Sequence, residues 1–234
     1  MAADQAQTLD NITLFQGLDP AARRALADRC RWQHYAVGQQ IVGQLDTSHD
    51  VFCIVKGRVR ATSYSLAGKE VSYRDIGAGE LVGEFSAIDG EPRSATVVAL
   101  TDSLVAAMSS AVFWQVLERH PSVAAAMLKS LTAQLRSLTN RVFEFSTLAV
   151  KNRIHAELLR LAHLNAPAGN TAVIDPAPTH AELASRISTH REAVTRELNA
   201  LVRGGLIERR GNRWHITDLA KLAHMVELVL GEQS

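Results

Sequence analysis

Short apolar runs separated by glycines fill the first half of the chain. Residues 51–55, 58–62 and 96–100 are rich in branched and small apolar side chains, and eight of the fourteen glycines lie between residues 38 and 90. Short strands with glycine turns at intervals of about ten residues predict an antiparallel β-roll, a jelly-roll-like architecture. Because strands and helices do not alternate here, a Rossmann fold is disfavoured.

Helical spacing appears on both sides of this region. A helix is expected after Asp19, with Asp19 as its N-cap and Pro20 at its first position. Residues 113–121 form another short helical segment, and a long helix follows Pro121. Its apolar residues are spaced alternately three and four apart: Leu128, Leu131, Leu135, Leu138, Val142 and Phe145. This narrow seam favours a parallel homodimeric coiled coil, and packing against the chain's own barrel is the alternative.

The last third of the chain has the pattern of a DNA-reading module. Thr179 and Glu182 form a T-x-x-E capping box at a helix start, and a second helix begins at Arg191 and stops at residues 204–205. A short hairpin then turns at residues 211–212. Two short helices joined by a tight turn and followed by a hairpin predict a winged helix-turn-helix.

These elements together predict an α+β protein with three parts. Residues 1–122 form the β-roll with its flanking helices, residues 123–147 the long dimerisation helix, and residues 148–234 the winged helix-turn-helix domain.

Composition and charge refine this picture. With 47% hydrophobic and 21% charged residues the chain has the composition of a soluble globular protein. The net charge of +1 by itself argues against a nucleic-acid binder, but residues 148–234 carry 11 basic and 9 acidic side chains, so the basic excess lies in the last third. No window approaches a membrane span and no leader pattern opens the chain, which predicts a cytoplasmic protein without a membrane partner.

The sequence gives no sign of catalysis or of a metal. Cys30 and Cys53 are too few for a disulfide scaffold or a four-thiolate site, and we expect both to be buried hydrophobes. No HExxH, nucleophile elbow or Walker loop occurs. His155 and His163 are interpreted as a pair on a helix surface. We therefore expect no catalytic residues, no metal ligands and no enzyme activity.

The outer face of the helix that begins at Arg191 carries side chains that read bases. Arginine donates to guanine, and glutamate accepts from cytosine, so Arg191, Glu192 and Arg196 have the required chemistry. An ion pair between Glu192 and Arg196, four residues apart, is the alternative. Other residues are expected to face DNA around this helix: Thr179, His180, Thr189, His190, Thr195, Arg210, Asn212 and Arg213.

A second segment, residues 79–97, combines a glycine, a carboxylate and an arginine. Gly83 lets backbone approach an anion, Glu84 could accept from sugar hydroxyls, and Arg93 could bind a phosphate. A salt bridge between Glu84 and Arg93 across a turn is the alternative.

Residues 79–97 resemble the phosphate-binding cassette of cyclic-nucleotide-binding domains. Residues 179–216, with their R-E-x-x-x-R, are similar to the winged helix-turn-helix of the bacterial cyclic AMP receptor protein family. The resemblance implies that Glu84 binds the ribose 2′-hydroxyl, Arg93 the cyclic phosphate and Ser94 the phosphate or the purine, with the backbone of Gly83 and Phe85 completing the site.

On the long helix, Leu138 and Thr139 match the family's purine-contacting pair, and only Thr139 keeps a hydroxyl. The resemblance implies cyclic AMP as the effector, and the loss of one hydroxyl weakens the discrimination between adenine and guanine, which makes cyclic GMP the second candidate.

The same resemblance implies a cyclic-nucleotide-responsive transcription regulator. Arg191, Glu192 and Arg196 match the base-reading positions, which implies a homodimer on double-stranded DNA with palindromic TGTGA-like half-sites and RNA polymerase as a further partner. Ser188 stands where the family has a glycine, and His190 where a serine caps the helix. A regulator of the same fold that answers another small effector is the alternative.

Overall fold

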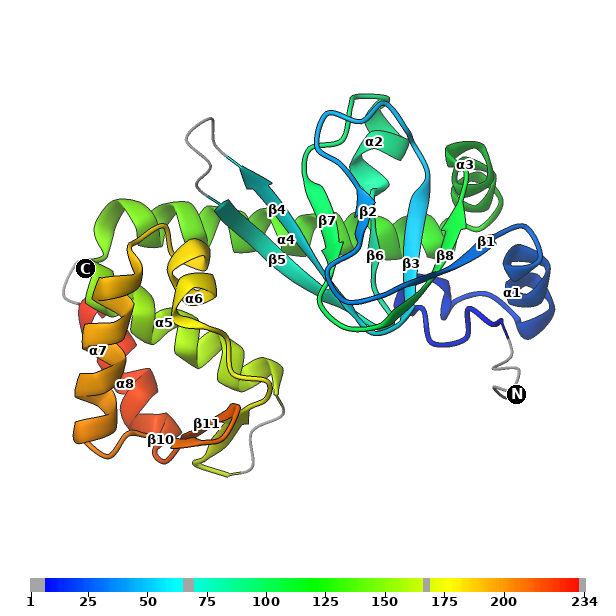
Figure 1. Ribbon diagram of the computed structural model, residues 1–234. Helices are drawn as coiled ribbons and strands as arrows, with labels where there is room; N and C mark the ends of the chain where they lie inside the picture. The colour runs from blue at the N-terminus through cyan, green and yellow to red at the C-terminus, as the bar shows by residue number, and fades with distance from the viewer. Residues whose placement is uncertain (1–6, 65–69, 166–168, 232–234) are drawn as a thin grey trace. The chain divides into compact units, whose positions relative to one another are not determined.

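The computed structural model describes residues 7–64, 70–165 and 169–231, with side chains as far as residue 227. The chain divides into two compact units, Met1–Leu135 and Arg136–Ser234. Each unit has its own hydrophobic core, so each is described by itself (Figure 1).

Two four-stranded sheets make up the body of the first unit. One has the order β1 (Arg31–Tyr35), β8 (Ser103–Met108), β3 (Val51–Lys56) and β6 (Leu81–Val82), and the other β2 (Gln40–Val42), β7 (Thr96–Ala99), β4 (Arg58–Tyr64) and β5 (Glu70–Gly77). Neighbouring strands pair antiparallel throughout these described strands. Val59 pairs with Ile76, and both are buried in a core shared with Ile54 and Val105 of the other sheet. The predicted β-roll is confirmed.

Short helices pack against the sheet that contains β3, β6 and β8. Helix α1 (Pro20–Ala27) begins as expected, because the Asp19 carboxylate accepts from the N–H of Ala22 at 2.8 Å. The 3₁₀ helix η1 (Thr13–Phe15) precedes it, and α3 (Ser110–Arg119) follows β8. The short helix α2 (Glu84–Asp89) lies inside the 79–97 segment and was not predicted.

A second core lies under these helices, built on Phe15, Phe113 and Met127. Cys53 is fully buried in it, and Cys30 packs against it. Both therefore behave as the small hydrophobes that the sequence indicates. Burial raises the pKa of the Cys30 thiol to about 11, so the thiolate is disfavoured at neutral pH.

Helix α4 spans Pro121–Thr147. Of its predicted seam, Leu131 packs against the core of the first unit and Phe145 against the core of the second. The other four members are exposed: Leu128 67%, Leu135 65%, Leu138 46% and Val142 65%. Of the six seam residues, only Leu131 is therefore explained by packing against the chain's own barrel.

The second unit contains the predicted helix-turn-helix and hairpin. After α5 (Val150–Leu164) come α6 (His180–Arg186) and α7 (Arg191–Arg203), then the hairpin of β10 (Ile207–Arg210) and β11 (Arg213–Ile216). The Thr179–Glu182 capping box is formed in both directions. The structure adds two elements that the sequence pattern did not reveal, β9 (Ala172–Ile174), which pairs with β11, and α8 (Leu219–Gly231).

The interpretation of His155 as a surface residue is wrong. Its side chain is 1% exposed and its Nε2 lies 2.7 Å from Glu197 Oε1 of α7. Helix α5 contacts α7 as well as α8, so it buries more than one of its faces. His163, two turns later, is exposed as expected.

Candidate functional site

Gly83 separates strand β6 from helix α2 and shapes the backbone of the candidate ligand site. Its φ is +90°, a left-handed conformation that favours glycine. A Cβ atom at this position would lie 2.7 Å from Arg93 Nη1 and 2.9 Å from the Asp50 carbonyl oxygen. A glycine is therefore required for the arginine to lie against this turn.

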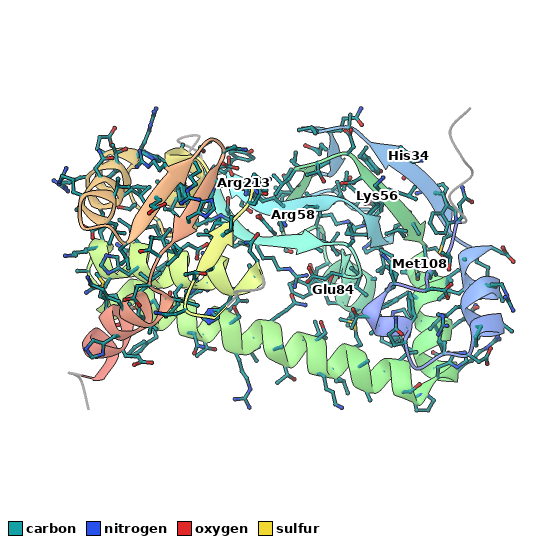
Figure 2. All side chains as sticks on the ribbon, turned by 90° about the horizontal axis from the view of Figure 1, so that it is seen from below. His34, Lys56, Arg58, Glu84, Met108 and Arg213 are labelled. Carbon is teal, nitrogen blue, oxygen red and sulfur yellow. The ribbon has the colours of Figure 1, made fainter. Side chains whose placement is uncertain are left out.

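Glu84 is the first residue of α2 and is only 4% exposed. One carboxylate oxygen, Oε1, accepts from Gln134 Nε2 of α4 at 3.2 Å. Among the described residues no other group donates to this carboxylate. Figure 2 labels Glu84 within the first unit. A buried carboxylate with spare acceptor capacity suits a ligand that brings hydroxyl donors.

Arg93 is 2% exposed and its guanidinium is bonded on several sides. Nη1 donates to the Gly83 carbonyl at 3.0 Å, Nη2 to the Asp50 carbonyl at 2.8 Å, and Nε and Nη2 both lie 3.2 Å from Ser48 Oγ. The guanidinium also lies over the Phe52 ring, 5.4 Å from its centroid. Burial lowers the Arg93 pKa, and the charges of nearby Asp50, Asp46 and Glu84 oppose that shift.

The alternative of a Glu84–Arg93 salt bridge does not describe this structure. Within the described part of the chain, Glu84 bonds to Gln134, and Arg93 bonds to Ser48 and to two backbone carbonyls. Sequence reasoning missed Ser48, Asp50 and Gln134, since each lies at least 43 positions from the Glu84 or Arg93 side chain that it contacts and no local pattern marks it.

The remaining ligand-site candidates fall into two groups. Phe85 and Ser94 belong to the first unit, where Phe85 follows Glu84 in the chain and Ser94 follows Arg93. Phe85 is 40% exposed, and Ser94 is exposed as well. Leu138 and Thr139 belong to the second compact unit. Their part in ligand binding stays a prediction.

The residues expected to read bases lie on the outer face of α7. Val194, Leu198 and Leu201 are buried on the opposite face. Arg191, Glu192 and Arg196 are exposed, and no described residue forms a hydrogen bond or an ion pair with their side chains. The alternative Glu192–Arg196 ion pair is therefore not formed, and all three side chains are available to a ligand.

His180 and Thr195 are connected to each other. His180 Nδ1 lies 2.7 Å from Thr195 Oγ1, and the Thr195 hydroxyl also lies 2.9 Å from the Arg191 carbonyl oxygen, to which it donates. The imidazole ring lies 6.3 Å from the Trp214 ring of the hairpin. Burial, together with the nearby charges of Arg209 and Arg191, lowers the His180 pKa. The Thr195 hydroxyl therefore forms its hydrogen bonds within the second unit.

Two arginines of the hairpin form ion pairs with acidic residues. Arg210 pairs with Glu208 at 2.6 Å, and Arg213, labelled in Figure 2, pairs with Asp175 at 2.8 Å. Asn212 and His190 are exposed, and Thr189 is half-buried. Since these ion pairs are exposed, a phosphate can compete for the arginines at little cost.

The turn between α6 and α7 has a left-handed residue at Ser188, with φ +52°. The resemblance to the family implies a glycine here, and the left-handed backbone explains why a glycine is suited to the position. The chain keeps the turn despite the serine.

Comparisons with known proteins match both parts of the chain. A family model for the cyclic nucleotide-binding domain matches residues 32–120, and one for the Crp-like helix-turn-helix domain matches residues 152–225. The cyclic AMP receptor protein of Thermus thermophilus is 31% identical over 194 residues, which cover 83% of this chain and 87% of that protein.

Two solved structures show the same fold. The catabolite activator protein of Thermus thermophilus is 28% identical with a TM-score of 0.53, over 92% of this chain and 99% of that chain. The c-di-GMP responsive global regulator CLP of Xanthomonas campestris is 22% identical with a TM-score of 0.72, over 83% and 97%.

The chain belongs to the CRP/FNR family of transcription regulators. It is a DNA-binding regulator with a cyclic-nucleotide-binding domain, and the family is not one of enzymes. Over the described residues no helix is long and apolar enough for a membrane span, and His, Cys, Asp and Glu do not gather in threes as a metal site requires.

Proposed function

We propose that this protein is a homodimeric regulator whose affinity for DNA is set by a cyclic nucleotide, with cyclic AMP as the first candidate and cyclic GMP as the second. The observation that carries the proposal is the burial of Glu84 and Arg93 at 4% and 2% exposure without an ion pair between them. Burying two charges that do not neutralise each other directly is costly, and a ligand that meets both compensates for that cost.

The chemistry of the two groups suits the phosphate and the ribose of a cyclic nucleotide. The guanidinium of Arg93 can bind a phosphate anion, and the Glu84 carboxylate can accept a hydrogen bond from a ribose 2′-hydroxyl. Gly83 and Phe85 contribute backbone, and Ser94 an exposed hydroxyl. Leu138 and Thr139 of α4 are proposed to contact the purine.

The exposed seam of α4 supports the homodimer. Leu128, Leu135, Leu138 and Val142 lie in an a/d spacing on a helix whose polar positions flank them. A second copy of α4 would cover this apolar row. In this proposal residues 1–122 sense the ligand, 123–147 join the two copies, and 148–234 bind DNA.

A dimer places two copies of α7 at two half-sites. Successive major grooves on one face of DNA lie about 34 Å apart, so a palindrome of TGTGA-like half-sites fits two recognition helices. Arg191, Glu192 and Arg196 read the bases. The residues around them hold phosphates: Thr179, His180, Thr189, His190, Arg210, Asn212 and Arg213. RNA polymerase is the proposed partner at the promoter.

Calorimetry with cyclic AMP and cyclic GMP tests the effector, followed by fluorescence anisotropy on a duplex with two TGTGA half-sites. We expect binding of at least one nucleotide and a DNA affinity that changes on binding by a factor of about 5 to 150, the usual range of allosteric coupling. Arg93→Leu removes the phosphate partner and should abolish binding. Arg24→Leu, an exposed arginine of α1, is the control.

A second candidate is the same DNA-binding role under a different effector. The observation that favours it is that Ser48, Gly83 and Asp50 already accept most of the Arg93 donors. A wild-type chain that binds neither cyclic AMP nor cyclic GMP, but binds c-di-GMP, the nucleotide named for the Xanthomonas relative, would support this candidate.

A further inference from the structure

The loop between β2 and β3 is fixed against the segment that carries Arg93. The Leu45 N–H donates to the Arg93 carbonyl at 2.9 Å, and the Arg93 N–H donates to the Asp46 carbonyl at 2.8 Å. Further along the loop, His49 Nε2 lies 3.0 Å from the Gly90 carbonyl oxygen. Leu45 and Asp46 precede Ser48 in the chain and His49 follows it, so these contacts hold Ser48 beside the Arg93 guanidinium.

The guanidinium has few donors left. An arginine side chain has five N–H groups. Nε–H and one Nη2–H point to Ser48 Oγ, the second Nη2–H to the Asp50 carbonyl, and one Nη1–H to the Gly83 carbonyl. One hydrogen on Nη1 is left. Arg93 alone can therefore offer a bound phosphate a single N–H without breaking a contact.

Ser48 has the donor that the arginine lacks. Its Oγ accepts from Arg93, and a hydroxyl that accepts still has its own hydrogen to donate. No described residue accepts that hydrogen. A hydroxyl that accepts from a cation is polarised and becomes a better donor. Ser48 is half-buried, so a ligand can reach it.

We propose that Ser48 is a ligand-binding residue of the effector site, donating its hydroxyl hydrogen to an exocyclic oxygen of a cyclic-nucleotide phosphate that lies near the Arg93 guanidinium. This inference rests on the proposed function and adds to it a residue that lies outside the 79–97 segment. The charge of Arg93 attracts the anion, Ser48 adds a directed hydrogen bond, and Ser48 also holds the guanidinium in place.

The test is calorimetry of Ser48→Ala against the wild-type chain with cyclic AMP and cyclic GMP. A hydrogen bond to a charged group contributes enough that its loss should weaken binding about tenfold or more. The loss should be equal for both nucleotides, because the phosphate is common to them and the base is not. Ser48→Thr keeps the hydroxyl and should bind within about threefold of wild type.

Thr47→Ala is the matched control, since it removes the hydroxyl of the exposed neighbour in the same loop. Its affinity should equal that of wild type. Equal affinity in Ser48→Ala would overturn the inference and leave the proposed function intact, and tighter binding would do the same by showing that Ser48 competes with the ligand. A wild-type chain that binds no cyclic nucleotide would overturn both. Thermal unfolding of Ser48→Ala confirms that the variant is folded.

Discussion

His155 on α5 and Glu197 on α7 are joined by a hydrogen bond of 2.7 Å between Nε2 and Oε1. The imidazole is almost completely buried, and its Nδ1 has no hydrogen-bond partner within the described part of the chain. The neutral ring can donate from Nε2 and leave Nδ1 bare, whereas a charged ring would bury an N–H without an acceptor. The contact ties the recognition helix to α5 in the uncharged state of the histidine.

Acid should therefore destabilise the second unit through His155. Burial lowers its pKa below the ordinary 6.5, although Glu197 opposes the shift. The unfolded chain then binds more protons than the folded chain, so this contribution to stability is complete above pH 6.5 and is lost as the pH falls below it. The limiting slope is about 1.4 kcal/mol per pH unit.

Urea unfolding at about pH 7.5, 6.5, 5.5 and 5.0 measures this slope. His155→Gln can still donate to Glu197 and does not titrate, so its stability should depend less on pH than that of wild type. His163→Gln, at an exposed position on the same helix, should keep the wild-type slope. Equal slopes in all three proteins would contradict the prediction.

Gly83→Ala should damage both the fold and the ligand site. Its Cβ would lie 2.7 Å from Arg93 Nη1 on a backbone with φ +90°. We expect a loss of about 1–3 kcal/mol in the free energy of unfolding and weaker nucleotide binding. Gly90→Ala is the matched control, because φ there is +75° and nothing lies within 4 Å of the added methyl. It should cost about 1 kcal/mol and leave ligand affinity unchanged.

Ser188→Gly should stabilise the second unit. A non-glycine residue in the left-handed region costs about 1–2 kcal/mol, and glycine removes that cost while adding some freedom to the unfolded chain. We expect a net gain of about 0.5–1 kcal/mol in thermal or urea unfolding. Thr189→Gly, at the next position, where φ is not positive, should lower stability instead. A loss in both variants would mean that the serine side chain contributes more than its backbone costs.

Charges in the α4 seam should prevent dimerisation. Leu128→Glu with Val142→Glu puts two carboxylates into the row that a second copy would bury, where an unpaired charge is costly. Sedimentation velocity should find wild type at twice the 25.5 kDa mass of one chain and the double variant at that mass itself. Lys129→Glu changes charge at the exposed position beside Leu128 and should stay dimeric. A wild-type monomer would contradict the proposed assembly.

Glu192→Ala should weaken operator binding without changing the affinity of the protein for its effector. A base contact of this kind is worth about 1–3 kcal/mol, so each half-site should lose about tenfold or more in affinity. Binding to a scrambled duplex should change little, because non-specific affinity depends on phosphate contacts. Arg203→Ala, at the far end of α7, should keep the preference for TGTGA. Unchanged discrimination in Glu192→Ala would remove this residue from base reading.

Local features of the chain were visible in the sequence. The Asp19 cap, the Thr179–Glu182 capping box, and the turn at residues 211–212 each depend on residues within a few positions of one another. The strand pattern with its glycine turns indicated the β-roll, and the spacing on α4 indicated its exposed row. Such features follow from backbone preferences and side-chain periodicity, which act over short distances along the chain.

The surroundings of the candidate site were decided by the tertiary structure. The sequence by itself determined that Glu84 and Arg93 belong to one segment, and that Arg191, Glu192 and Arg196 share a helix face. Only folding brought Ser48 to Arg93 across 45 positions and Gln134 to Glu84 across 50, and only the packing of α5 on α7 buried His155. Contacts over such separations are fixed by how strands and helices pack, because no periodicity along the chain specifies which distant side chains will meet.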